Sequence, residues 1–258
     1  MRAFLVGRNG MTADFIWYVV IGFCAQVVDG ALGMAYGVTA TSLLLGAGVP
    51  PVVASATVHA AECFTTGASA VSHHAFGNID KALFRRLLLP GIAGAAVGAY
   101  LLSVLPGDAM KPWIAGYLIL MGLVVLSKAF GEFPPRRVTS HVQPLGFVGA
   151  MLDAIGGGGW GPIVASTLLA RGSEFRITVG SVNAVEFFVT LTASLTFVLT
   201  IGLGYWPVII GLALGGVVAA PLGAWLVKRV PVKPMMVLVG LLIIGLSLRT
   251  LAMHFGLL

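Results

Sequence analysis

Long apolar segments alternate with short polar connections along the chain. Six of the apolar segments are uninterrupted, and they lie at about 52–76, 86–105, 111–128, 177–200, 206–227 and 234–252. A helix rises about 1.5 Å per residue, so each segment is long enough to cross about 30 Å of hydrocarbon. The pattern predicts an all-α polytopic membrane protein.

Two further apolar segments, 13–48 and 142–170, are interrupted by glycine-rich runs that each begin with an aspartate. The runs are Asp29–Val38 and Asp153–Pro162, and the second contains four consecutive glycines. Each glycine costs a helix about 1 kcal/mol relative to alanine, so we expect each segment to form a broken, re-entrant-like helical hairpin. Inside a bilayer, freed backbone groups are tolerated only where protein or water receives them. Each break is therefore a candidate binding site.

The chain contains an internal repeat. Asp29 matches Asp153 and Glu62 matches Glu186 at a shift of 124 positions, and this register holds without a gap from Gly22 to Ser69. We expect residues 1–130 to form the first transmembrane repeat, 131–141 a linker and 142–258 the second repeat. Each repeat would be a broken hairpin followed by three transmembrane helices. Three crossings is an odd number, which predicts two inverted repeats whose breaks meet near the membrane centre.

Composition supports a membrane protein and excludes an ordinary soluble domain. Only 9% of the residues are charged, whereas soluble domains carry about 25%. The net charge of +6 is typical of membrane-protein loops and indicates no nucleic-acid partner. The predicted arrangement places 11 of the 15 basic residues on one side, which the positive-inside rule makes cytoplasmic, with both termini opposite. These residues are Lys81, Arg85, Arg86, Lys128, Arg136, Arg137, Arg171, Arg176, Lys228, Arg229 and Lys233.

A polar stripe follows the first break. Its members are three or four residues apart, which places them on one helix face: Ser55, His59, Glu62, Thr66, Ser69 and His73. In the second half, Asn183 matches His59 and Glu186 matches Glu62. A carboxylate at a membrane-helix centre costs about 2.5–3.5 kcal/mol, so these faces should look inward. They either bind protons on a transport pathway or form a hydrogen-bond network between helices.

The two aspartates allow two interpretations. Asp29 and Asp153 either cap the helix that follows each break or act directly, together with His59, Glu62 and Glu186, in proton coupling.

The second leg of each hairpin begins at an aromatic residue followed by glycine. Its free N–H groups and the positive end of its dipole form a ready anion site. Replacing Gly158 or Gly159 by Val should remove binding while the protein still folds. The residues expected to contact the anion are Gly33, Tyr36, Gly37, Gly157, Gly158, Gly159, Trp160 and Gly161. No catalytic or metal motif is present, so we predict no catalytic residue, no metal site and no cofactor.

Four motifs resemble the TauE/SafE family of sulfite exporters, also called the TSUP permeases. They are Gly30–Gly37 with Thr39, Ser55–Glu62, Gly156–Pro162 and Gly180–Glu186, in a two-repeat layout that covers nearly the whole chain. The resemblance implies a secondary transporter for a small sulfur-containing oxyanion, sulfite or an organosulfonate, in the bacterial inner membrane. Thr39, close after the first break, and Asn183, which matches His59, complete the expected substrate contacts.

The resemblance fixes neither the direction of transport nor the substrate; we favour export slightly over uptake, and the sequence leaves the coupling ion and the oligomeric state open. The alternatives are an uptake permease, a passive channel for a small organic anion, and an integral-membrane enzyme. In such an enzyme, His59, Glu62 and His73 would be acid/base or metal residues. The partners expected of a transporter are the small anion, the lipid bilayer and, for a coupled mechanism, protons.

Overall fold

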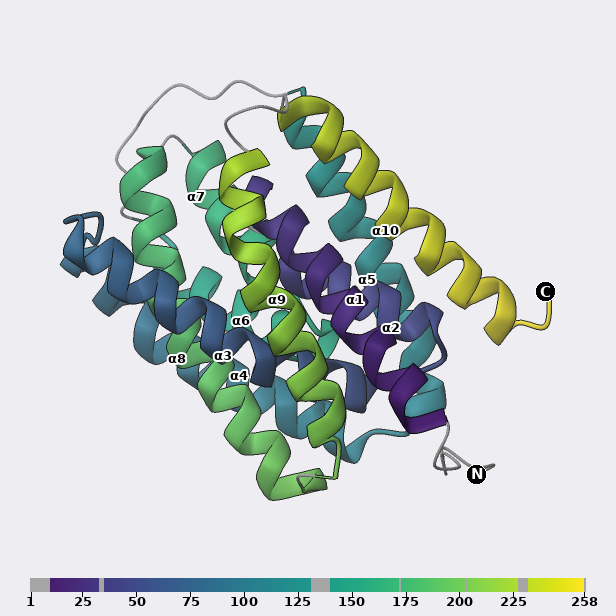
Figure 1. Cartoon of the computed structure of the whole chain (residues 1–258). Coiled ribbons are helices and arrows are strands. Elements are labelled where there is room, and N and C mark those ends of the chain that lie inside the picture. The colour runs from purple at the N-terminus through teal and green to yellow at the C-terminus, as the bar shows by residue number, and fades with distance from the viewer. Residues whose placement is uncertain are drawn as a thin grey trace.

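A computed structural model describes residues 10–32, 35–130, 140–171, 173–202, 204–226 and 232–257, and all regular secondary structure within them is helical (Figure 1). The prediction of an all-α protein is confirmed. The described residues form ten α-helices and one π-helical turn: α1 (Gly10–Leu32), α2 (Tyr36–Gly46), α3 (Pro51–Ala75), α4 (Lys81–Val104), α5 (Gly107–Lys128), α6 (Val142–Gly156), η1 (Gly161–Ala165), α7 (Ser166–Ala170), α8 (Phe175–Ile201), α9 (Trp206–Leu226) and α10 (Val232–His254).

Each of the six uninterrupted apolar segments forms a single helix. Four of them are both long and apolar enough to cross a membrane, namely Lys81–Val104, Gly107–Ser127, Ile177–Ile201 and Met236–His254. The helix α3 is also long enough, with 25 residues, but it is not among these four candidates. Its polar stripe lowers its mean hydropathy. In α9, the stretch Trp206–Ala219 counts as a shorter apolar helix.

Both predicted helix breaks are present. The first helix ends at Leu32 and α2 begins at Tyr36, while α6 ends at Gly156 and η1 begins at Gly161. The second break needs glycine, because Gly157, Gly158 and Gly159 have φ angles of 71°, 145° and 147°. Gly33, in the first break, lies outside the described residues. So do residues 131–139, which form most of the expected linker.

The helices pack in pairs that relate the two halves. The most extensive helix–helix contacts are those of α1 with α9, α4 with α6, α5 with α10, and α3 with α8. The pairing of α5 with α10 is visible at the right of Figure 1. At the shift of 124 positions, α1 matches α6 and α4 matches α9, so the first pair corresponds to the second. The other two pairs each join a helix to its own match.

Small residues permit the closest of these contacts. A Cβ atom added at Gly94 or Gly98 of α4 would meet the backbone of Phe147 or Met151 in α6. In the same way, a Cβ atom at Gly215 of α9 would meet the backbone of α1. Close approach of this kind is typical of membrane helices, where packing replaces the hydrophobic effect between helices.

Candidate functional site

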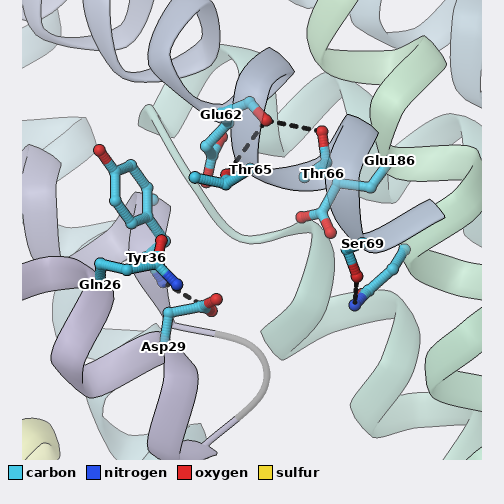
Figure 2. A pocket seen from close by; sticks show the side chains of 10 residues that line it. Gln26, Asp29, Tyr36, Glu62, Thr65, Thr66, Ser69 and Glu186 are labelled. Atoms are coloured by element: carbon cyan, nitrogen blue, oxygen red, sulfur yellow. Dashed lines mark hydrogen bonds between the residues drawn. The ribbon is translucent and has the colours of Figure 1, made fainter. Parts of the chain in front are cut away.

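A polar cavity of about 150 Å³ lies between α1, the start of α2, α3 and α8 (Figure 2). The cavity lies beside the first helix break, where the sequence predicts a binding site. The cavity is lined by Gln26, Asp29, Tyr36, Gly37, Glu62, Thr65, Thr66, Ser69, Asn183 and Glu186.

Among the described residues, the lining of this cavity includes three carboxylates and no basic side chain. Glu62 is 5% exposed, and Asp29 and Glu186 are partly exposed. Among the described residues, the carboxylates of Glu62 and Glu186 accept no hydrogen bond. The nearby hydroxyl groups of Thr65 and Thr66 instead donate to the backbone oxygen of Glu62, at 3.1 and 2.7 Å. The cavity is therefore rich in hydrogen-bond acceptors and in negative charge when the acids are ionised.

Asp29 holds the start of α2. Its Oδ1 atom accepts hydrogen bonds from the backbone N–H groups of Ala35 and Tyr36, at 2.9 and 3.2 Å. These are two of the groups at a helix start that lack an acceptor within the helix. The capping interpretation of Asp29 is therefore confirmed. The side chain also lines the cavity, so capping does not remove it from the site.

The two helix breaks touch each other at Gly37. A Cβ atom added there would lie 2.7 Å from Cα of Gly158 and 2.9 Å from Oε1 of Glu62. Two side chains secure the crossing: the hydroxyl of Thr41 donates to the carbonyl of Gly157, and the hydroxyl of Tyr117 donates to the carbonyl of Gly158 at 3.0 Å. The breaks therefore converge, as the repeat predicted.

The glycines of the second break fill this crossing and do not line the cavity. A Cβ atom at Gly158 would collide with the backbone of Gly37, and one at Gly159 with the hydroxyl of Tyr117. Both glycines also have positive φ angles, which strain any other residue. The expectation that Gly158→Val or Gly159→Val leaves the fold intact is therefore wrong.

A closed network surrounds the second aspartate. Oδ1 of Asp153 accepts from the backbone N–H of Trp160 at 2.9 Å, so Asp153 also caps its break, while Oδ2 lies 3.1 Å from Nε2 of His59. The Nδ1 atom of His59 lies 2.8 Å from the backbone oxygen of Ser55. The indole N–H of Trp160 donates to the carbonyl of Val182 at 3.1 Å. His59, Asp153 and Trp160 are buried and lie outside the cavity lining.

The matched positions of the two halves therefore differ in exposure. Asp29, Tyr36 and Gly37 line the cavity, whereas their matches Asp153, Trp160 and Gly161 do not. Trp160 has an exposed fraction of 0%. The cavity therefore lies beside the first break, and the matching residues of the second break are buried outside its lining.

Exposure along the polar stripe shows where the cavity opens. At the start of the stripe, Ser55 and His59 are 1% and 0% exposed. Further along, Glu62 and Thr66 are 5% and 8% exposed, and Ser69 is only half-buried. The cavity therefore opens towards the C-terminal end of α3. His73, near that end, contacts Asn78 at 3.2 Å and does not line the cavity.

Other expected residues have separate positions. Asn183 lines the cavity and donates through Nδ2 to the hydroxyl of Ser69 at 3.1 Å. Thr39 is buried, lies outside the lining, and its hydroxyl has no partner among the described residues. In the part of the chain that the structure describes, no group of three His, Cys, Asp or Glu side chains is placed to hold a metal ion.

Sequence reasoning missed Gln26 and Thr65. Gln26 is 7% exposed, lines the cavity, and its Oε1 atom has no hydrogen-bond partner within the described residues. A signal was available, because Gln26 is an isolated polar residue in an apolar helix, three positions before Asp29 and therefore on the same face. Its match in the second half is Ala150, so the repeat gave no support for it.

Comparison with known proteins identifies the family. The family model "Sulfite exporter TauE/SafE" matches residues 18–250. The chain is 45% identical over 246 residues to "Probable membrane transporter protein YtnM" of Bacillus subtilis (strain 168), an alignment that covers 92% of this chain and 82% of that protein. It is 26% identical over 250 residues to "Probable membrane transporter protein ORF9" of Sinorhizobium sp, covering 90% of each. No solved structure matches the chain.

These relatives are named as transporters and not as enzymes, which excludes the integral-membrane enzyme as an interpretation of the stripe on α3. Together with the apolar helices and the polar cavity between them, the matches show a multi-pass membrane transporter. The chain belongs to the sulfite exporter TauE/SafE family.

Proposed function

We propose that this transporter moves a small sulfur-containing oxyanion, of the sulfite or organosulfonate type, across the bacterial inner membrane, mainly as an exporter. The observation that carries the proposal is the polar cavity at the start of α2, inside an otherwise apolar bundle. Its volume of about 150 Å³ suits a small ion, since pockets for drug-sized ligands enclose about 300–1,000 Å³.

The start of α2 supplies the donors for the oxyanion. The first hydrogen bond within the helix runs from Thr39 N to Ala35 O at 3.1 Å, so the N–H groups of Gly37 and Val38 precede the helical ladder. Among the described residues, neither group has an acceptor. Gly37 lines the cavity, and its missing side chain lets a ligand approach the backbone closely. An oxyanion here would also interact favourably with the positive end of the helix dipole.

The acids of the cavity link anion binding to protons. Glu62 and Glu186 have no basic partner in the lining, and an ionised carboxylate would repel an anion across a cavity of this size. A proton on these groups removes the repulsion and the cost of burying an unpaired charge. We therefore assign Glu62 and Glu186 as the proton-binding groups, which makes transport a coupled process and not passive flow through a channel.

We further propose that the two halves, 1–130 and 142–258, are inverted repeats joined by a cytoplasmic linker. The repeat in the sequence, the matched helix breaks and the corresponding helix pairs support this arrangement. The first turn of α1 and the last turn of α10 lie at one end of the bundle, and the start of α10 lies at the other (Figure 1). With the basic loop at Lys81–Arg86 cytoplasmic, the cavity opens towards the cytoplasm, where an exporter loads its substrate.

A binding screen on the purified protein tests the function. Sulfite, thiosulfate, sulfoacetate and taurine should raise the apparent melting temperature, because a ligand that binds only the folded state stabilises it. Acetate is the control for a small anion without sulfur and should have a smaller effect at equal concentration. The proposal fails if none of the sulfur anions stabilises a well-folded preparation, or if acetate stabilises it as strongly.

A further inference from the structure

The cavity offers more hydrogen-bond acceptors than a simple anion can use. Within the described residues, the carboxylates of Glu62 and Glu186 and the Oδ2 atom of Asp29 accept no hydrogen bond, and Oε1 of Gln26 is unpartnered although its side chain is more than nine-tenths buried. The lining hydroxyl groups of Thr65 and Thr66 already donate to the backbone. Of these acceptor atoms, Oε1 of Gln26 is the buried one without a donor among the described residues, and such an acceptor is unfavourable by about 1–3 kcal/mol.

A ligand that satisfies these atoms must itself be a strong donor. A primary ammonium carries three N–H donors, no acceptor and a positive charge, which matches the excess of acceptors and the absence of a basic side chain. Hydrogen bonds between charged groups are also stronger than neutral ones. An oxyanion alone would satisfy Gly37 and leave Gln26 and the acids without a donor.

The acceptors of the cavity come from more than one helix. Glu62 of α3 lies close to Gly37 at the start of α2, whereas Glu186 and Asn183 come from α8. Figure 2 shows the carboxylates of Asp29 and Glu186 directed towards the space between α1 and α8. A short molecule with an anion at one end and a cation at the other could contact Gly37 with the anion and reach Glu186 on α8 with the cation.

We propose that the preferred substrate is a small zwitterion in which a short carbon chain joins an oxyanion to a primary ammonium. This rests on the proposed function and deepens it, because the oxyanion keeps its place at Gly37 and the ammonium contacts Gln26, Glu62 and Glu186. The ammonium offsets the acids without any proton uptake. A zwitterion should therefore cross with less dependence on a pH gradient than an anion of the same length.

Two probes of nearly equal shape separate the proposals. Taurine (2-aminoethanesulfonate) and isethionate (2-hydroxyethanesulfonate) differ only in an ammonium or a hydroxyl at the same position. For the wild-type protein we expect taurine to bind about tenfold more tightly or better, the change given by about 1.4 kcal/mol. Glu186→Gln and Glu62→Gln should reduce this ratio to about twofold or less. Glu174→Gln, which removes an exposed carboxylate just before α8 and outside the cavity, should keep the wild-type ratio.

The outcomes distinguish the two levels of the proposal. If isethionate binds the wild-type protein as tightly as taurine, the zwitterion is excluded and the oxyanion function stands. If the preference for taurine persists unchanged in both glutamate variants, the ammonium binds elsewhere and this inference is overturned. If neither sulfonate nor sulfite binds a well-folded protein, the proposed function itself fails. The wild-type comparison needs no variant, so a variant that does not fold cannot hide the result.

Discussion

Nε2 of His59 lies 3.1 Å from Oδ2 of Asp153, and this contact joins α3 to the end of α6 where the second helix break begins. Nδ1 of His59 lies 2.8 Å from the backbone oxygen of Ser55 and 3.3 Å from the Ser55 hydroxyl, so both ring nitrogens have polar partners. The pair is buried and ties α3 to the second break inside the bundle.

Replacing Asp153 tests how much this pair supports the fold. Asp153→Ala removes the acceptor of the Trp160 N–H and the partner of His59, both buried, and should lower stability by about 3–5 kcal/mol. Asp153→Asn is the matched control, because its oxygen can accept from Trp160 and its amide can donate to a neutral His59. We expect a clear fall in the melting temperature for the alanine variant and a small one for asparagine. Equal melting temperatures for the two variants would contradict this role.

Because the two breaks are in contact at Gly37, a larger residue at this position should destabilise the protein. In Gly37→Ala the added methyl group would press on Cα of Gly158 and on the Glu62 carboxylate, at 2.7 and 2.9 Å. Overpacking of this kind costs about 1–3 kcal/mol, and it should also weaken binding of sulfite.

The control for Gly37→Ala is Gly116→Ala in the middle of α5. No atom lies within 4 Å of a Cβ at Gly116, so helix propensity alone should leave this variant neutral or up to about 1 kcal/mol more stable. Melting curves and sulfite binding, measured on both proteins, check the pair. A Gly37→Ala protein as stable as Gly116→Ala, with unchanged binding, would show that the crossing is not tightly packed.

The proposed membrane topology predicts which exposed positions can be labelled from outside. In a background with Cys24→Ala and Cys63→Ala, a cysteine at Asp108, at the start of α5, should react with an impermeant maleimide in intact cells. A cysteine at Lys81, at the start of α4, should react only after the cells are permeabilised. Labelling at Lys81 but not at Asp108 in intact cells would reverse the proposed orientation.

Trp160 should matter for packing more than for binding. It is fully buried, its indole N–H donates to the carbonyl of Val182, and its ring lies 3.3 Å from where a Cβ of Gly91 would be. Trp160→Ala should therefore cost about 3–5 kcal/mol, and Trp160→Phe less. Sulfite affinity of the phenylalanine variant should stay within about twofold of wild type. A large loss of affinity without a loss of stability would instead indicate direct contact with the substrate.

The sequence allowed the helices, the breaks and much of the cavity to be predicted, because their causes are local or periodic. Four consecutive glycines interrupt a helix wherever they occur, and the three-and-four spacing brings Glu62, Thr66 and Ser69 to one face. The carboxylate pair could also be recognised from the sequence. Inserting Glu62 and Glu186 into apolar membrane helices is energetically unfavourable, and such residues usually have a functional role.

Other features depend on tertiary packing and could not be predicted. Tyr36 and Trp160 occupy matching positions, yet Tyr36 lines the cavity and Trp160 is sealed against α4 and α8. A repeat shows that two positions correspond, but it does not show which of them a given conformation opens. Gln26 has no polar match in the second half, so the repeat that revealed the other residues could not reveal it.

Isethionate flux into proteoliposomes, with and without a pH gradient, tests most directly whether Glu62 and Glu186 couple anion movement to protons. The sulfonate keeps its charge near neutral pH, so any response to the gradient belongs to the protein. The wild type should transport faster when the isethionate side is acidic, because protons on these buried acids remove their repulsion of the anion. Glu62→Gln and Glu186→Gln should carry isethionate at rates that no longer depend on the gradient, with Glu174→Gln as the control. A wild-type response to the gradient in both cavity variants would contradict the central claim.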